Sequence, residues 1–233
     1  MIPRPFYVEK VMKYADTPQV KVLCGIRRCG KSTIMLMITD EFRKRGVPES
    51  CIIHYRFDSL EYDNLKTAKA LYERIKSLLV PEQKTYLFFD EIQEVADWEK
   101  AVNSLMQDFN TDIYVTGSNS RMMSSEIATY LTGRYISFTI YPLSFAEYLD
   151  FRAQYTAPSN THEELARYLK FGGFPAVNLR DYTQEEAYTI VFDIYNSVIF
   201  SDIVKRSQIR KVDLLERIVK YIFSNTGCLF SSL

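Results

Sequence analysis

The sequence is poor in cysteine, histidine and glycine, and each shortage narrows the kind of site it can hold. Its four cysteines stand at positions 24, 29, 51 and 228, and it has two histidines. No two cysteines form a C-x-x-C pair and none stands near a histidine, which argues against a zinc site. With only 8 glycines in 233 residues, a glycine motif carries information.

The sequence also lacks an excess of charge and a long apolar run. The 29 basic residues balance the 29 acidic ones, so no overall field draws the chain to nucleic acid or to an anionic membrane, although local patches remain open. No stretch reaches the roughly 18 consecutive apolar residues of a membrane-spanning helix. The start, Met1-Ile-Pro-Arg-Pro, has no apolar signal-peptide region. We therefore expect a cytoplasmic protein with no membrane partner.

The strongest motif present is Gly25-Ile-Arg-Arg-Cys-Gly-Lys-Ser32, which fits the phosphate-binding pattern G-x-x-x-x-G-K-[S/T] at every defined position. It lies between a strand-like and a helix-like run, a context in which backbone N–H groups and a helix dipole converge on one point. Lys31 is expected to reach the β- and γ-phosphates, and the Ser32 hydroxyl to bind Mg²⁺. The expected nucleotide-binding residues are Gly25, Ile26, Arg27, Arg28, Cys29, Gly30, Lys31, Ser32 and Thr33.

Parts of this motif allow a second interpretation. Arg27 and Arg28 either touch phosphates or partner acids, or are solvated. Cys29 is either a reactive thiol, because a helix N-terminus favours thiolate, or a bystander. The alternative for the whole motif is a chance match in a glycine turn.

Strand-like and helix-like runs alternate through the first two-thirds of the chain. The expected strands are Val20–Cys24, Cys51–Phe57, Tyr86–Asp90, Asp112–Thr116 and Tyr135–Ile140, and the expected helices are Ser32–Arg45, Asn64–Leu79, Trp98–Phe109 and Ser124–Leu131. This alternation predicts an α/β fold with right-handed crossovers and a mainly parallel sheet covered by helices on both faces. Ligands of such sheets bind beyond the carboxyl ends of the strands.

The strand signal stops after Ser144. The expected helices are then Ser144–Phe151, Glu163–Phe171, Gln184–Arg206 and Val212–Ser224. The polar stretch Gln154 to Thr161 separates two expected domains, an α/β domain at 1–153 and a helical C-terminal domain at 162–233. Because the last residues resemble the cap of a helix that does not follow, we expect a fragment of a longer protein.

The run Tyr86-Leu-Phe-Phe-Asp90-Glu91 predicts the second half of a nucleotide site. An acid at the carboxyl end of a buried strand can hold the Mg²⁺ shell, the role expected of Asp90. Glu91 beside it is expected to orient and polarise an attacking water as a general base. The alternative for Glu91 is an exposed glutamate at a strand end.

Two further candidates lie after the next strand. Ser118 or Asn119, at its tip, is expected to sense the γ-phosphate, although small polar residues are also ordinary turn formers. Arg134 is expected to neutralise transition-state charge, from the same chain or from a neighbour. Its alternative is a surface ion pair.

Four stretches occur in an order typical of one family. They are the glycine motif, Phe88-Phe-Asp-Glu-Ile-Gln93, Val115-Thr-Gly-Ser-Asn119, and Leu131-Thr-Gly-Arg134 with Tyr141-Pro-Leu-Ser-Phe145. In these the chain resembles predicted bacterial and archaeal ATPases of the AAA+ superfamily. The resemblance implies a three-layer P-loop NTPase sandwich with sheet order 5-1-4-3-2, and ATP and Mg²⁺ as ligands. It implies functional roles for Lys31, Asp90, Glu91, Ser118 or Asn119, and Arg134.

The leading hypothesis is a Mg²⁺-dependent ATPase whose hydrolysis moves the helical C-terminal part or a partner. The first alternative is a nucleotide-gated switch or scaffold with little intrinsic hydrolysis, and a small-molecule kinase is the second. A second copy of the chain and another protein are the expected kinds of partner. Longer members of the family continue into a winged-helix-like module and a nuclease-like domain, so nucleic acid is a partner only if such a module follows.

Overall fold

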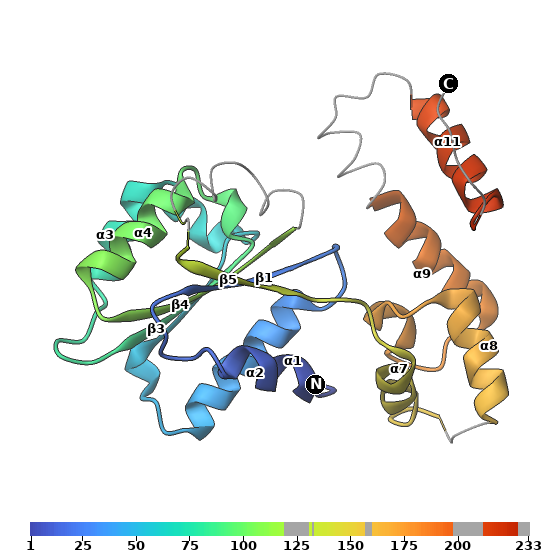
Figure 1. Ribbon diagram of the computed structural model, residues 1–233, viewed down its shortest axis with the longest axis horizontal. Helices are drawn as coiled ribbons and strands as arrows, with labels where there is room; N and C mark the ends of the chain where they lie inside the picture. Colours follow the sequence, from blue (N-terminus) through green and yellow to red (C-terminus); the bar gives the residue numbers. More distant parts are fainter. Residues whose placement is uncertain (119–130, 132, 157–159, 198–211, 228–233) are drawn as a thin grey trace. The chain divides into compact units, whose positions relative to one another are not determined.

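The computed structural model describes residues 1–118, 131, 133–156, 160–197 and 212–227 (Figure 1). Two compact units make up the chain, Met1–Tyr182 and Thr183–Leu233. The helix expected at Ser124–Leu131 lies, apart from Leu131, outside the described residues. The domain bounds expected from the sequence, 1–153 and 162–233, stay a prediction.

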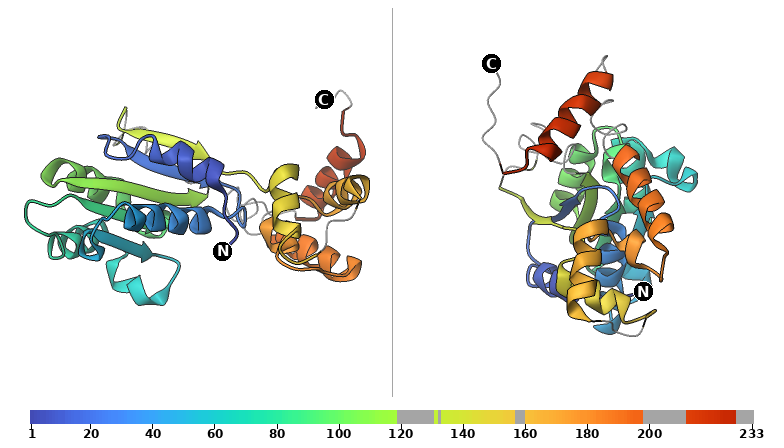
Figure 2. Two further views of the ribbon diagram at one scale, coloured as in Figure 1. Left: turned by 90° about the horizontal axis from the view of Figure 1, so that it is seen from below. Right: turned by 90° about the vertical axis from the view of Figure 1, so that its right-hand side faces the viewer.

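Five parallel strands form the sheet of the first unit. They are β1 (Val20–Gly25), β2 (Ile52–Arg56), β3 (Thr85–Asp90), β4 (Thr111–Ser118) and β5 (Tyr135–Thr139). Their order is β2-β3-β4-β1-β5, which is the expected 5-1-4-3-2 read from the other edge. The left panel of Figure 2 shows the strand arrowheads pointing the same way, so the carboxyl ends of the strands share one edge of the sheet. The predicted fold class is confirmed.

Helices cover both faces of this sheet. On one face, α1 (Pro5–Met12) and α2 (Lys31–Lys44) pack against side chains such as Leu23 and Phe88. On the other, α3 (Ala68–Lys76) and α4 (Trp98–Asp108) pack against Val22 and Phe89. Consecutive residues of a strand point to opposite faces, so these neighbouring pairs supply one side chain to each layer. The result is a three-layer α/β/α sandwich (Figure 1).

The central strands are buried on both faces, which explains their almost continuous apolar sequence. Every residue of β1 and of β3 is buried. Phe88 of β3 stacks on Tyr114 of β4 with ring centroids 4.9 Å apart. Full burial of a side chain of this size stabilises the fold by about 1.5–3 kcal/mol. The sheet is therefore a rigid support for the loops at its carboxyl edge.

Two helical segments differ from the sequence prediction. The first is α1, where no element was expected; Pro5 occupies its first turn and Tyr7 is buried against the sheet. The second is the helix expected at Asn64–Leu79. It is a 3₁₀ segment, η2 (Leu60–Leu65), followed by α3.

The break has a local cause. Thr67 is extended, its side chain caps α3 at the Ala70 N–H, and its backbone pairs with Ala96. Other short 3₁₀ segments are η1 (Glu49–Cys51), which takes the first residue of an expected strand, and η3 (Ile92–Glu94), which follows β3.

The first unit continues after β5 into α7 (Phe145–Arg152), α8 (Thr161–Phe171) and η4 (Pro175–Asn178). Ser144 and Glu147 form the expected capping box at the start of α7. Gly173 packs so closely on the chain before α7 that a Cβ there would lie 2.2 Å from the Leu143 carbonyl oxygen. This contact requires glycine and fixes the turn between α8 and η4.

The second unit contains α9 (Gln184–Asn196) and α11 (Val212–Ser224). A second capping box, of Thr183 and Glu186, begins α9. The sequence predicted this helix to reach Arg206, but residues 198–211 lie outside the described part of the chain. The bounds of α11 are those predicted. No helix among the described residues is both long and apolar enough to cross a membrane.

Candidate nucleotide site

The glycine motif forms a tight loop, residues 25–32, between β1 and α2. A Cβ on Gly25 would lie 2.3 Å from the Ile140 carbonyl oxygen and 2.9 Å from the Cys29 sulfur, so a side chain does not fit there. Gly30 begins α2 with φ +100°, in the left-handed region that favours glycine. Both glycines of the motif are therefore required by the backbone of this loop.

The N-terminus of α2 begins after a glycine. Gly30 has no side chain that could cap the first N–H groups of the helix. The buried Lys31 ammonium donates to the carbonyl oxygens of Gly25 at 3.1 Å and Ile26 at 3.2 Å. The loop thus brings together a helix N-terminus, a cation and close backbone, the set that binds polyphosphate. These residues fit the phosphates of a nucleotide.

The remaining residues of the loop differ in exposure. Ile26, Arg27 and Arg28 are exposed, Ser32 is half-buried and Thr33 is exposed. Cys29 is fully buried in the core beneath α2, and burial raises the pKa of its thiol despite the nearby charge of Lys31. A buried neutral thiol is a poor nucleophile. The structure favours the bystander interpretation of Cys29.

Asp90 ends β3 beside Thr116 of β4. Its side chain is buried, and the Thr116 hydroxyl donates to Asp90 Oδ1 while accepting a hydrogen bond from the Glu91 N–H at 3.0 Å. Gly25, at the start of the loop, lies two strands away from Asp90, about 10 Å across the sheet at the usual strand spacing. A bound phosphate and its metal ion fit within such a span.

Glu91 follows directly in the left-handed region, with φ +52°. Its carboxylate is half-buried and accepts a hydrogen bond from the Gln93 side-chain amide. Gln93 Oε1 is buried and has no hydrogen-bond partner among the described residues. The turn after β3 therefore holds Glu91 at the carboxyl edge of the sheet, beside a free acceptor.

The two sensor candidates are placed only in part. β4 lies between β1 and β3, and the Ser118 backbone is in register with Gly25. The backbone of Ser118 is thus adjacent to the loop. Asn119 lies outside the described residues. Neither sensor role is tested by this geometry, and both stay predictions.

Arg134 is not brought to this site. It precedes β5, where its carbonyl oxygen accepts a hydrogen bond from the Val20 N–H at 2.8 Å and its exposed guanidinium donates to Asn103 of α4 at 2.9 Å. Val20 begins β1 and Gly25 ends it. Arg134 therefore lies at the amino ends of the strands and the loop at their carboxyl ends, about 16 Å apart along the strand. A role within the same chain has no support in this placement, whereas supply to a neighbouring chain stays a prediction.

The candidate metal ligands are Ser32 and Asp90. Both carry oxygen ligands, which suit Mg²⁺, an ion that usually keeps several waters and binds through substrate phosphates. Among the described residues, no three His, Cys, Asp or Glu side chains gather into a metal site of their own. The donor set therefore fits a metal that arrives with a nucleotide.

Three residues near the site were not predicted from the sequence. Thr116 and Gln93 contact the two acids, and Arg4 donates to the Cys29 carbonyl in the loop at 3.0 Å. Thr116 could have been found as a strand-end hydroxyl in register with Asp90. Arg4 has no local sequence signal, because its partners are 25 to 143 residues away.

Comparison with known families agrees with this arrangement. Residues 17–149, more than half of the chain, match the family described as "AAA domain". The chain belongs to the AAA domain family. In this AAA domain protein, residues 162–232 also match a family described as a domain of unknown function.

Curated relatives of this AAA domain protein include an uncharacterized protein of Haemophilus influenzae, which is 36% identical over 228 residues. The match covers 97% of this chain and 56% of the length of the relative. An uncharacterized protein of Methanocaldococcus jannaschii is 33% identical over 219 residues, covering 89% of this chain and 47% of its own. The AAA domain protein thus spans about half the length of the curated relatives it matches.

Solved structures share the fold. The Walker-type ATPase of Pyrococcus abyssi superposes with a TM-score of 0.59 at 14% identity, over 95% of this chain and 78% of its own. A DNA polymerase III gamma subunit-related protein of Thermotoga maritima gives 0.50 at 13% identity, over 79% and 58%. At these identities the likeness establishes the P-loop NTPase fold of this AAA domain protein.

Proposed function

We propose that this chain binds ATP with Mg²⁺ between loop 25–32 and the tips of β3 and β4, and hydrolyses it. The observation that carries the proposal is the tip of β3, where Asp90 ends the buried strand, Glu91 follows it, and the Thr116 hydroxyl bonds both the Asp90 carboxylate and the Glu91 N–H. A second carboxylate beside a metal-binding one is what activation of water requires. Simple phosphate binding does not require it.

The residues divide this work. Lys31 exchanges the carbonyl oxygens of Gly25 and Ile26 for phosphate oxygens. Ser32 and Asp90 hold the bound Mg²⁺, whose charge offsets that of the phosphates. Glu91 orients the water and accepts its proton, and Ser118 or Asn119 contacts the γ-phosphate. Hydrolysis then alters the helical C-terminal part or a partner protein. Because ATP is the substrate, we place this activity in the cytosol.

Glu91→Gln tests the proposal. The amide keeps the size of the side chain but cannot accept the proton, so we expect ATP affinity to change less than threefold and turnover to fall by about 100-fold or more. Calorimetry measures the affinity and phosphate release the turnover. Glu94→Gln, which changes an exposed carboxylate at the end of the 3₁₀ segment that follows Glu91, is the matched control and should turn over as the wild type. Wild-type turnover in Glu91→Gln would overturn the general-base role.

A nucleotide-gated switch is the second candidate, and one contact favours it. The Gln93 amide engages the Glu91 carboxylate, so the base is partly occupied, and Arg134 lies at the far edge of the sheet. Such a protein would bind ATP but hydrolyse it only with a partner. Single-turnover hydrolysis at rising protein concentration separates the two functions: ordinary turnover at the lowest concentration excludes the switch. Phosphate transfer to anything but water would instead indicate a kinase.

A further inference from the structure

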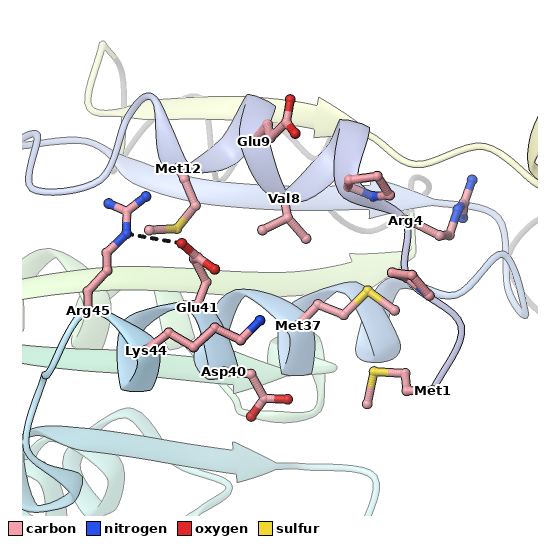
Figure 3. Close-up of a pocket in the computed structure, with 12 residues that line it drawn as sticks. Met1, Arg4, Val8, Glu9, Met12, Met37, Asp40, Glu41, Lys44 and Arg45 are labelled. Carbon is pink, nitrogen blue, oxygen red and sulfur yellow. Dashed lines mark hydrogen bonds and ion pairs between the residues drawn. The ribbon is translucent and has the colours of Figure 1, made fainter.

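Arg4 is an arginine buried beside the candidate phosphate loop. Its side chain is 2% exposed. Figure 3 shows it at the start of α1, at one end of a groove between α1 and α2, with the guanidinium directed away from the groove. The groove has a volume of about 420 Å³. A buried guanidinium needs partners for its donors. The partners of Arg4 come from three separate parts of the chain.

The first partner is the phosphate loop. Arg4 Nη1 donates to the Cys29 carbonyl oxygen at 3.0 Å, and a Cβ placed on Gly30 would lie 3.7 Å from the same nitrogen. In a trans peptide the carbonyl oxygen and the next N–H point in opposite directions. By holding the Cys29 carbonyl, Arg4 therefore directs the Gly30 N–H away from itself. An anion bound in the loop draws on N–H groups of this kind, so the two interactions favour the same peptide orientation.

The second and third partners lie after β5. Arg4 Nη2 donates to the Tyr141 carbonyl oxygen at 3.0 Å, in the segment that joins β5 to α7. The Arg4 guanidinium also donates two hydrogen bonds, a fork, to the Glu147 carboxylate in α7, from Nε to Oε1 at 2.8 Å and from Nη2 to Oε2 at 3.1 Å. A bidentate pair of this kind fixes the geometry as well as the distance.

Glu147 connects this fork to the start of α7. Its Oε2 accepts hydrogen bonds from the Ser144 N–H at 2.9 Å and the Ser144 hydroxyl at 3.1 Å, which complete the capping box. Burial alone would raise the pKa of Glu147, but Arg4 and Ser144 outweigh it and lower that pKa. The carboxylate is thus charged and shared between Arg4 and the first turn of α7.

We propose that Arg4 is a positioning residue that transmits the occupancy of loop 25–32 to the junction at residues 140–144 and to the first turn of α7. The inference rests on the proposed nucleotide binding. When phosphates fix the loop peptide, the Cys29 carbonyl fixes Arg4, and Arg4 in turn fixes Tyr141 and Glu147. Nucleotide therefore orders the entry to the helical segment through Arg4, in addition to the direct backbone packing of Gly25 on Ile140, and with no contact between the nucleotide and α7.

Hydrogen–deuterium exchange with and without Mg²⁺ and a non-hydrolysable ATP analogue tests this proposal. In the wild type we expect the analogue to slow exchange at least threefold both in peptides covering 25–33 and in peptides covering 141–152. Glu147→Gln keeps the bond from Arg4 to the Tyr141 carbonyl but weakens the fork to α7, so we expect the slowing at 25–33 to remain and that at 141–152 to be reduced. Arg4→Lys keeps the charge but loses the fork, so it should reduce the slowing at 141–152 as well.

The matched control is Arg43→Gln. Arg43 makes a similar fork with Glu49, at 2.8 and 2.7 Å, but on the exposed surface of α2 and away from the junction. It should keep both responses to the analogue. A merely structural role of Arg4 would alter exchange equally with and without nucleotide, whereas transmission alters only the difference.

The outcomes separate this proposal from the proposed function. Slowing at 25–33 but not at 141–152 in the wild type overturns the transmission and leaves nucleotide binding intact. Wild-type slowing at 141–152 in both Glu147→Gln and Arg4→Lys overturns it too. If Arg4→Lys does not fold, Glu147→Gln decides alone. No slowing anywhere, with no binding in calorimetry, rejects the proposed function itself.

Discussion

At the scale of single residues, the Thr116 hydroxyl joins the two acids of the candidate site. It donates to Asp90 and accepts from the Glu91 N–H, so both acids depend on one oxygen atom of the neighbouring strand. This atom therefore ties the Asp90 carboxylate to the backbone of Glu91, while the Glu91 carboxylate is held separately by Gln93.

Thr116→Val should therefore affect both stability and turnover. Valine keeps the shape but leaves the Glu91 N–H and the buried Asp90 carboxylate without this partner, which should cost about 1–3 kcal/mol of unfolding free energy. Urea unfolding and phosphate release measure the two effects. Thr116→Ser keeps the hydroxyl and should stay close to the wild type in both. Equal stability of the valine and serine variants would contradict this account.

The backbone of the loop could be predicted because its motif fixes both the spacing and the conformation of its residues. The structure requires glycine at positions 25 and 30, whereas the phosphate contact expected of Lys31 stays a prediction. Thr116, Gln93 and Arg4 were missed because their partners come from other strands or from distant segments. For Arg134 the sequence left open whether it acts within one chain or from a neighbour, and its role stays a prediction. Arg134 directly precedes the parallel strand β5, which places it at the amino ends of the strands, opposite the loop.

At the scale of elements, β1 and β4 are joined at their amino ends by a buried ion pair. Lys21 and Asp112 are fully buried, and Asp112 also accepts hydrogen bonds from the Asp16 N–H and the Tyr114 hydroxyl, each at 2.9 Å. Burial lowers the pKa of Lys21, although Asp112 opposes that shift. The pair is costly to bury and costly to break.

Asp112→Ala should destabilise the protein by about 3–5 kcal/mol, because it leaves the buried Lys21 ammonium without a carboxylate and with the Thr17 carbonyl oxygen as its remaining acceptor. Lys21→Met combined with Asp112→Leu should recover much of that loss. Glu49→Ala, which breaks an exposed pair with Arg43, is the control and should cost at most about 1 kcal/mol. Chemical denaturation measures all three. A loss in Asp112→Ala no larger than in the control would contradict the role of the buried pair.

The start of α7 should respond to pH through Glu147. Burial is outweighed by Arg4 and Ser144, so the folded-state pKa lies below the ordinary 4.5. The stability that this group contributes is present above pH 4.5 and is lost as the pH falls through the folded-state pKa.

The difference in melting temperature between wild type and Glu147→Gln should thus be largest at neutral pH and shrink below pH 4.5. Comparison with the variant removes the contribution of Asp181, whose pKa is lowered by Arg152. A difference that stays constant down to pH 3 would show that the carboxylate does not act in this way.

Elements could be predicted well where burial on both faces requires a continuous run of apolar residues. The central strands are apolar on both faces, and their expected bounds agree with β1, β3 and β4 to within two residues. The break before α3 was missed because Thr67 bonds to Ala96, a tertiary pairing that overrides local helical pattern. The helix α1 was missed although Pro5 in its first turn is an ordinary start signal.

At the scale of the whole molecule, the candidate site lies at the carboxyl ends of the strands and Arg134 at their amino ends. If Arg134 acts, it acts on the phosphates of a neighbouring chain. Arg134→Ala should then keep wild-type ATP affinity and lose turnover by about 10³-fold or more. Wild-type turnover of Arg134→Ala at high protein concentration would exclude this role.

Mixing variants provides a direct check. Glu91→Gln retains Arg134 but lacks the base, and Arg134→Ala retains Glu91 but lacks the arginine. Each variant should therefore be inactive alone. Their mixture should regain phosphate release, because one chain supplies the arginine and the other the base. Arg43→Gln mixed with Glu91→Gln should show only the activity of the former. A mixture as inactive as its components would place any arginine requirement outside Arg134.

The placement of Arg134 has a consequence for how many nucleotide sites of an assembly receive an arginine. If Arg134, at the amino ends of the strands in one chain, contacts the phosphate loop at the carboxyl ends of the strands in the next chain, the contact joins two different surfaces. Head-to-tail contacts of this kind either close into a ring or form an open filament. In an open filament the terminal phosphate loop receives no arginine, whereas in a ring every loop receives one. The fraction of bound ATP that is hydrolysed in a single turnover would then report whether the assembly is closed.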